Sequence, residues 1–105
     1  MIYYVDIDET ICEYEDGKRE YPLAKPIVEN IKKINMLYDA GHTVVYWTAR
    51  GATTGIDWTE LTMKQLDQWG ARYTEAKLGK PNYDVFICDK AINTSVFFGE
   101  VNEHP

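Results

Sequence analysis

Asp6 and Asp8 stand one residue apart, directly after residues 2–5, an apolar run that is typical of a buried strand. Because side chains two positions apart in an extended chain point the same way, both carboxylates could face one ligand. That arrangement suits one divalent cation and one phosphoryl group. A carboxylate can attack phosphorus when a cation screens the repulsion between the two anions, and the product is an aspartyl-phosphate. We therefore predict Asp6 as nucleophile and metal ligand, and Asp8 as general acid and base that also contacts the metal.

Mg²⁺ is the expected cation, because it is hard, octahedral and satisfied by carboxylates, carbonyls and waters. Asp89 ends the apolar run 85–88 and is the predicted third carboxylate of the metal site. Asp84 is an alternative, but it stands at the start of that run. An EF-hand calcium loop is excluded, because it would need glycine where Ile11 stands and glutamate where Gly17 stands.

A phosphate-binding group is predicted from two later positions. Thr48 follows the apolar run 43–47, and its hydroxyl could hold a phosphate oxygen together with the backbone amides of Ala49 and Arg50. The guanidinium of Arg50 could add a two-pronged contact to the phosphate or to the substrate. Lys80 stands in a Gly-Lys-Pro turn, where its ammonium could stabilise both the nucleophile and the oxygens of the transferring phosphoryl group. Each residue alone also fits an ordinary strand end, turn or solvated position, and only their order along the chain favours phosphoryl transfer.

The elements that must position these residues follow from the apolar pattern. Runs 2–5, 43–47 and 85–88 are continuous, as in the inner strands of a parallel sheet. A helix is predicted between the first two runs, with Pro26 at its first position and Gly41 just past its end. Alternating strands and helices predict a parallel α/β sheet with right-handed crossovers. In such folds ligands bind at the carboxyl ends of the strands, which is where the candidate residues stand.

A second helix is predicted over the middle of the chain. Asp57 and Glu60 match the capping-box pattern at its start, and Gly70 closes it. Its apolar face is interrupted only by Gln65. A weaker strand is predicted around residues 73–78.

Two short features complete the pattern. Residues 12–21 predict a polar hairpin with its turn at the Asp-Gly pair 16–17 and with Glu15 facing Lys18, which would form an exposed flap beside the site. Residues 96–98 predict a short edge strand.

Length and charge limit the functional classes. A chain of 105 residues has room for one domain, and a net charge of −6 makes non-specific nucleic-acid binding unexpected. No apolar run approaches the length that crosses a bilayer, and no basic segment precedes the apolar N-terminus as in a signal peptide. Cys12 and Cys88 are expected to be free thiols, so we predict a cytoplasmic protein that does not contact a membrane.

With these residues in this order, the chain resembles the haloacid dehalogenase (HAD) superfamily of phosphatases over almost its whole length. The positions similar to its four motifs are residues 6–10, Thr48, Lys80 and Asp89. Segments 46–50, 78–81 and 87–91 are also similar to small capless members, which are associated with capsule or polysaccharide biosynthesis and with phage-encoded phosphatases.

The resemblance implies a Rossmann-like three-layer sandwich around a mostly parallel sheet, with a short β-hairpin flap, no cap domain and one domain over residues 1–105. It also implies a Mg²⁺-dependent aspartyl-phosphate on Asp6, with Asp8 as acid and base. Thr48 and Lys80 would bind phosphate and Asp89 the metal.

The chain departs from the superfamily pattern in two respects. Many relatives carry paired acids in the fourth motif, whereas here Cys88 precedes the aspartate, which removes one carboxylate from the metal's surroundings. Segments 11–25 and 51–56 are too short for a cap domain, so the site is expected to be open to a phosphorylated small molecule or to an accessible phosphate of a larger substrate. A partner subunit in a homo-oligomer could supply a lid.

Three readings of this pattern compete. Asp8, two residues after the nucleophile, favours transfer to water and hence a phosphomonoesterase over a dehalogenase. A response-regulator receiver domain would need its acceptor aspartate at the end of a middle strand, where this chain has Thr48. A non-catalytic module that binds metal or phosphate for a partner is the third reading, and the presence of every expected catalytic side chain argues against it.

Overall fold

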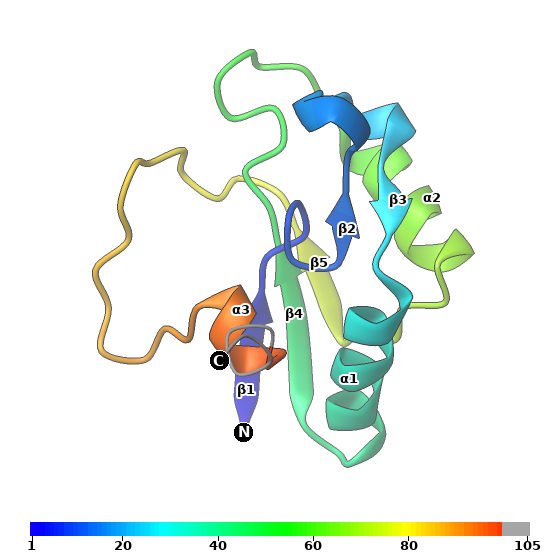
Figure 1. The fold of residues 1–105 in the computed structure, drawn as a ribbon, viewed down its shortest axis with the longest axis vertical. Helices are drawn as coiled ribbons and strands as arrows, with labels where there is room; N and C mark the ends of the chain where they lie inside the picture. The colour runs from blue at the N-terminus through cyan, green and yellow to red at the C-terminus, as the bar shows by residue number, and fades with distance from the viewer. Residues whose placement is uncertain (100–105) are drawn as a thin grey trace.

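The computed structural model describes residues 1–99, which form an α/β fold built on a three-stranded parallel sheet (Figure 1). The sheet has the order β1-β4-β5, and its strands are β1 (Ile2–Val5), β4 (Thr43–Trp47) and β5 (Glu75–Lys77). β4 lies in the middle, with Val5 opposite Tyr46 on one side and Ala76 opposite Tyr46 on the other. The three strands therefore end at one common edge.

Helices and a small hairpin surround this sheet. The helices are α1 (Val28–Asp39), α2 (Thr59–Gln68) and the short α3 (Thr94–Phe97). The antiparallel hairpin pairs β2 (Cys12–Glu13) with β3 (Lys25–Pro26). Residues 14–24 connect β2 to β3 through two 3₁₀ turns, η1 (Glu15–Gly17) and η2 (Tyr21–Leu23), and we call this segment the flap. No helix within residues 1–99 is long and apolar enough to cross a membrane.

The core lies between the sheet and the first two helices. Alternate residues of β4, Val44 and Tyr46, are fully buried, because every second side chain of a strand points to the same face. Ile31 and Ile34 of α1 and Leu66 of α2 pack into the same cluster. Burial of this apolar face fixes both helices against the sheet and so fixes the loops that follow the strands.

The first two predicted strands and both predicted helices are confirmed. One boundary is wrong: Pro26 pairs with Cys12 in the hairpin, and α1 begins two residues later at Val28. At the start of α2, Oδ1 of Asp57 accepts a hydrogen bond of 2.9 Å from the amide of Thr59, but the N-cap residue is Trp58, one position later than the capping box predicted.

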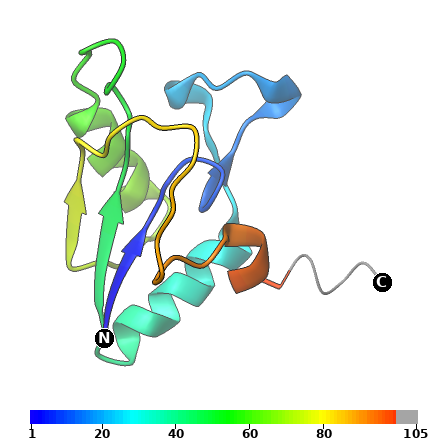
Figure 2. The same cartoon turned by 90° about the vertical axis from the view of Figure 1, so that its left-hand side faces the viewer.

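The predicted strand at residues 85–88 is wrong. The third strand is β5, within the region 73–78 that the sequence marked only as a weaker strand. Residues 85–88 belong to a long exposed connection from β5 to α3 that leaves the sheet and runs across the β1 side of the molecule (Figures 1 and 2). Ile87 is 93% exposed. A β-prone run becomes a strand only where a neighbouring strand offers it hydrogen bonds, and this run has no such neighbour among the described residues.

Two smaller predictions need correction. The turn at residues 16–17 is present, with positive φ at both positions (55° and 68°), but the strands it was expected to join pair farther out, at residues 12–13 and 25–26. Glu15 consequently forms an ion pair with Lys25 rather than with Lys18.

The edge strand predicted at residues 96–98 is wrong, because these residues lie in and just after α3. The side chain of Asn93 accepts a hydrogen bond of 3.0 Å from the amide of Ser95 and so caps this helix. Local capping chemistry therefore outweighs the β propensity of the Val-Phe-Phe run.

Candidate active site

A cleft of about 890 Å³ opens at the carboxyl ends of β1 and β4. It collects most of the residues that the sequence singled out: Asp6, Asp8, Thr48, Ala49, Arg50 and Lys80. Flap residues and the start of α3 line its sides. These six residues therefore lie together at one edge of the sheet, whereas Asp89, which was expected to join them, does not line the cleft.

Asp6 is the accessible member of the Asp6–Asp8 pair, with 42% of its side chain exposed in the cleft. Its Oδ1 accepts a hydrogen bond of 2.9 Å from the amide of Ile7, and its Oδ2 lies 3.6 Å from Nζ of Lys80. Burial raises the pKa of Asp6 above its ordinary value, and the Lys80 ammonium and the Ile7 amide offset only part of this effect. Asp6 is thus partly desolvated, fixed in direction and open to a ligand.

Lys80 reaches Asp6 because its loop is tied to the end of β4. The amide of Lys80 donates to the carbonyl oxygen of Thr48 at 3.1 Å, and the amide of Thr48 donates to the carbonyl of Lys77 at 3.0 Å. The ammonium also lies over the rings of Trp47 and Tyr83, at 5.8 and 5.3 Å from their centroids. These contacts keep a cation beside the accessible carboxylate.

Thr48 is buried at the floor of the cleft, with 1% of the residue exposed. Its Oγ1 accepts a hydrogen bond of 3.2 Å from the amide of Arg50. The hydroxyl proton of Thr48 therefore remains available to a phosphate oxygen, whereas the Arg50 amide, one of the predicted phosphate donors, is already used. Ala49 lines the cleft, and the contact of its amide with phosphate stays a prediction.

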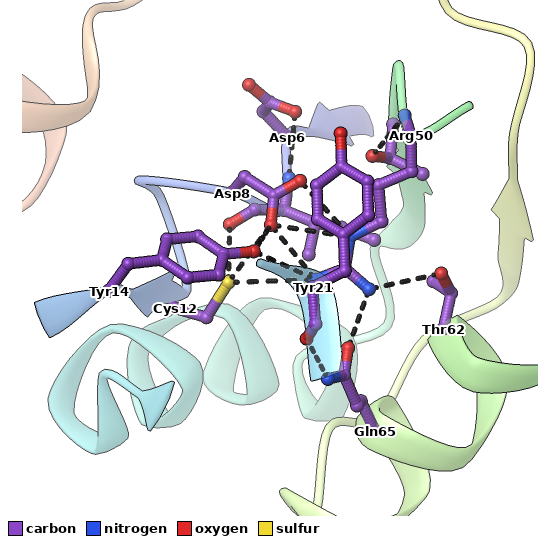
Figure 3. A network of polar contacts seen from close by, with 10 residues as sticks. Asp6, Asp8, Cys12, Tyr14, Tyr21, Arg50, Thr62 and Gln65 are labelled. Atoms are coloured by element: carbon purple, nitrogen blue, oxygen red, sulfur yellow. Dashed lines mark hydrogen bonds and ion pairs between the residues drawn. The ribbon is translucent and has the colours of Figure 1, made fainter. Parts of the chain in front are cut away.

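Asp8 is enclosed, in contrast to Asp6, and only 8% of it is exposed. Its carboxylate accepts hydrogen bonds from Nε and Nη2 of Arg50, at 3.1 and 2.9 Å, from the hydroxyl of Tyr14, and from the thiol of Cys12 at 3.4 Å (Figure 3). Burial pushes the pKa of Asp8 upward, but the hydrogen bonds from Arg50 and Tyr14 outweigh it and hold the pKa below the ordinary value. Asp8 therefore rests as a carboxylate.

The Arg50 side chain is not placed for the predicted phosphate contact in this structure. The guanidinium is completely buried and donates to Asp8, to Oγ1 of Thr62 at 3.2 Å and to Oε1 of Gln65 at 2.6 Å. The physical reason is that the buried carboxylate of Asp8 needs a partner, and a planar guanidinium provides two parallel donors. Arg50 is thus committed to protein groups.

Tyr14, Thr62 and Gln65 are site residues that the sequence did not single out as functional. One signal for Gln65 was present, because it is the polar residue that interrupts the apolar face of α2. In the structure it is 5% exposed and turned toward Arg50. Nothing in the spacing of Tyr14 or Thr62 indicated their roles.

The predicted metal site of Asp6, Asp8 and Asp89 is not assembled. Asp89 lies on the exposed connection before α3 and does not line the cleft. Within residues 1–99 no group of three His, Cys, Asp or Glu side chains could hold a metal ion. The cause is the missing strand at 85–88, which would have carried Asp89 to the sheet edge.

A more modest metal site does fit the residues present. Mg²⁺ commonly binds through one or two carboxylates together with waters and the phosphates of a substrate. The carboxylate of Asp6 faces the cleft and is accessible, whereas that of Asp8 is occupied by Arg50. Of the three predicted carboxylate ligands, Asp6 alone is therefore placed for a cation in the cleft, which Glu9 and Glu20 also line.

Comparison with known proteins supports the fold. The chain matches no protein-family model and no curated protein. It is similar to the crystal structure of an MCSG target protein from Vibrio cholerae, with a TM-score of 0.78 and 22% sequence identity over 97% of this chain and 94% of that one. At this identity the likeness shows the α/β fold alone.

Proposed function

We propose that this chain is a phosphomonoesterase that uses Asp6 as its nucleophile. The observation that carries the proposal is the pairing of an accessible, partly desolvated carboxylate with the ammonium of Lys80, 3.6 Å away, at the mouth of an open cleft. Thr48 adds a free hydroxyl proton beside them. A nucleophile, a cation and a neutral donor are the groups that phosphoryl transfer requires.

The reaction proceeds in two displacements. In the first, an oxygen of Asp6 forms a bond to phosphorus while the bond from phosphorus to the ester oxygen breaks, and the leaving oxygen takes up a proton. In the second, water attacks the aspartyl-phosphate, loses a proton, and releases inorganic phosphate and the free carboxylate. Lys80 and Thr48 hold the phosphoryl oxygens throughout.

Asp8 is assigned the proton transfers of both steps. It follows Asp6 by two residues and lines the same cleft. Its resting carboxylate is ready for the base role on the attacking water. For the acid role it must first take up a proton, which requires its hydrogen bonds from Arg50 to loosen.

Mg²⁺ belongs to this proposal as a cofactor held by Asp6 together with the phosphate of the substrate. When bound there it would neutralise charge on the phosphoryl oxygens and so reduce the repulsion that the anionic nucleophile meets. The ammonium of Lys80 supplies part of the positive charge needed beside Asp6.

The substrate class follows from the cleft. At about 890 Å³ and without a cap domain, it can take a phosphorylated small molecule or an accessible phosphate of a larger substrate. Both cysteines, Cys12 and Cys88, are free, and we place the enzyme in the reducing environment of the cytoplasm. A second copy of the chain as a lid over the cleft remains part of the proposal.

The test is release of inorganic phosphate from a broad panel of phosphomonoesters in the presence of Mg²⁺. Asp6→Asn removes the attacking charge at nearly constant volume, so turnover should fall by about 10⁴-fold or more. Asp84→Asn is the matched control, because Asp84 is an exposed aspartate outside the cleft. Near-normal hydrolysis by a folded Asp6→Asn protein would refute the assignment of the nucleophile.

A non-catalytic phosphate-binding module is the second candidate function. Two observations favour it: the ion pair with Arg50 occupies the carboxylate of Asp8, and Asp89 lies outside the cleft. This module would bind inorganic phosphate through Lys80 and Thr48 but would hydrolyse no member of the panel. No observation favours a receiver domain, since the central strand β4 ends in Trp47 and Thr48 rather than in a carboxylate.

A further inference from the structure

The guanidinium of Arg50 sits in an enclosed polar network in which each of its nitrogens has a protein partner (Figure 3). None of its side-chain surface is exposed. On one side Nε and Nη2 hold the carboxylate of Asp8, and on the other Nη1 donates to Thr62 and Gln65 of α2. Arg50 therefore links the loop after β1 to the helix that follows β4.

Two tyrosines of the flap also contact this network. The hydroxyl of Tyr14 donates to Asp8, and the ring of Tyr21 lies over the guanidinium at 4.8 Å. Gln65 completes the link, because its Nε2 donates to the backbone carbonyl of Tyr21 at 2.6 Å while its Oε1 accepts from Arg50. One buried arginine thus touches both the acid/base carboxylate and the segment that covers it.

A side chain that binds phosphate would need to expose its charged group to the cleft. The ammonium of Lys80 keeps part of its surface in the cleft, with 13% of its side chain exposed beside accessible Asp6. The guanidinium of Arg50 has no exposed surface, and a phosphate could reach it only by displacing Asp8, Thr62 or Gln65. Such a displacement would leave a buried polar group without a partner, which is costly.

We infer that Arg50 is a positioning residue, which holds the carboxylate of Asp8 in place and, through Gln65 and Tyr21, fastens the flap at the side of the cleft without binding the substrate's phosphate. The inference rests on the proposed function for the role of Asp8. Its structural part, the fastening of the flap and the absence of a phosphate contact, can be tested without any turnover.

The first experiment measures the flap by limited trypsin digestion. Lys18 and Arg19 are exposed trypsin sites on the flap. Arg50→Lys keeps the charge but loses the planar fork, and Gln65→Met keeps the volume but loses both hydrogen bonds. Each variant should be cut after Lys18 or Arg19 about 10-fold faster than the parent protein, because the flap opens more often.

A matched control comes from a second arginine–aspartate pair. Arg72 binds Asp39 through Nε at 2.9 Å and through Nη2, but this pair is exposed and joins the end of α1 to the segment after α2, so neither residue belongs to the flap. Arg72→Lys should leave the rate of flap cleavage unchanged. Unchanged cleavage in both Arg50→Lys and Gln65→Met would overturn the fastening role.

The second experiment measures the dissociation constant of inorganic phosphate by calorimetry. In Arg50→Lys it should stay within about twofold of the parent value, whereas in Lys80→Met it should rise by about 10-fold. Equal weakening in the two variants would assign phosphate binding to Arg50 and overturn the inference. If Arg50→Lys does not fold, Gln65→Met replaces it, with the same expectation of unchanged phosphate affinity.

Kinetics then separate the inference from the proposed function. If the parent protein hydrolyses phosphomonoesters, Arg50→Lys and Gln65→Met should lower kcat by about 10²-fold through misplacement of Asp8, with KM within about threefold of the parent value. A rise in KM with kcat unchanged would contradict the positioning role. If the parent protein hydrolyses none, the proposed function fails, and digestion and phosphate binding still decide what Arg50 does.

Discussion

Nζ of Lys80 lies 3.6 Å from Oδ2 of Asp6, although Lys80 follows β5 and Asp6 follows β1. The backbone hydrogen bond from Lys80 to Thr48 holds the ammonium there. Because this pair faces an open cleft, part of the attraction is available to any anion that enters.

Removal of the Lys80 ammonium should therefore slow the proposed phosphoester hydrolysis more than it disturbs the fold. Lys80→Met should lower kcat/KM for a phosphomonoester by about 10²–10³-fold, because a preorganised charge at the phosphoryl oxygens is lost. Steady-state kinetics on the purified variant would measure this. Lys77→Met is the control, since Lys77 is half-exposed and lies outside the cleft. Equal activities of the two variants would contradict a role for Lys80 at the phosphate.

Metal binding should depend on phosphate, because Asp6 is the one predicted carboxylate ligand that remains accessible in the cleft. Mg²⁺ alone should raise the Tm only slightly, and Mg²⁺ with inorganic phosphate should raise it more than the two separate shifts combined. Differential scanning fluorimetry would show this. Asp89→Asn should not alter the response, and Asp6→Asn should abolish it. A large shift with Mg²⁺ alone that disappears in Asp89→Asn would mean that Asp89 reaches the cleft in solution.

The pairing of Asp8 with Arg50 should make stability depend on pH in a defined direction. Since the pKa of Asp8 is lowered in the folded state, its ionised form stabilises the protein fully above about pH 4, the ordinary value for an unfolded chain. That contribution is lost as the pH falls through the lowered folded-state pKa. Urea unfolding of the parent protein and of Asp8→Asn should differ by about 3–5 kcal/mol at pH 7, and the difference should narrow on acidification.

The exposed pair of Asp39 and Arg72 provides the comparison for this pH effect. The pKa of Asp39 is also lowered by its hydrogen bond from Arg72, but both side chains are about half exposed. Asp39→Asn should therefore change stability less than Asp8→Asn, and salt should reduce its effect. A salt-sensitive, equally large effect at both positions would contradict the burial argument.

Gly51, the residue after Arg50, is required by a close approach of two backbone segments. Its φ is +82°, and a Cβ atom there would lie 2.1 Å from the carbonyl oxygen of Ile56. Gly51→Ala should lower the free energy of unfolding by about 2–4 kcal/mol, from overpacking and from the left-handed backbone together. Urea denaturation would measure this loss.

Gly55 is the control for the steric part of the Gly51→Ala effect. Its φ is also positive (+75°), but nothing lies within 4 Å of a Cβ atom placed there. Gly55→Ala should cost only about 1–2 kcal/mol, which is the backbone term alone. If the two alanine variants were equally stable, the contact with Ile56 would not be tight in solution.

Much of the site could be predicted from the sequence because its signals are local. The apolar runs before Asp6 and Thr48 indicate strands by composition alone, and parallel strands bring their carboxyl ends to one edge whatever the remaining packing is. Lys80 follows the weaker strand region at 73–78 and joins them for the same reason. The topology of the sheet thus brings Asp6, Thr48 and Lys80 together, and the local sequence pattern is enough to predict it.

The roles of Asp89 and Arg50 were decided only by the tertiary structure. Asp89 would reach the cleft only if residues 85–88 paired with a neighbouring strand, and pairing depends on distant partners that composition does not reveal. The guanidinium of Arg50 is bound by Asp8 and Gln65, which come from separate parts of the chain and meet only when α2 packs on the sheet. The sequence by itself determined which groups stand at the strand ends, whereas long-range packing decided which of them remain free to meet a ligand, because a buried polar group must bind whatever partner the fold brings to it.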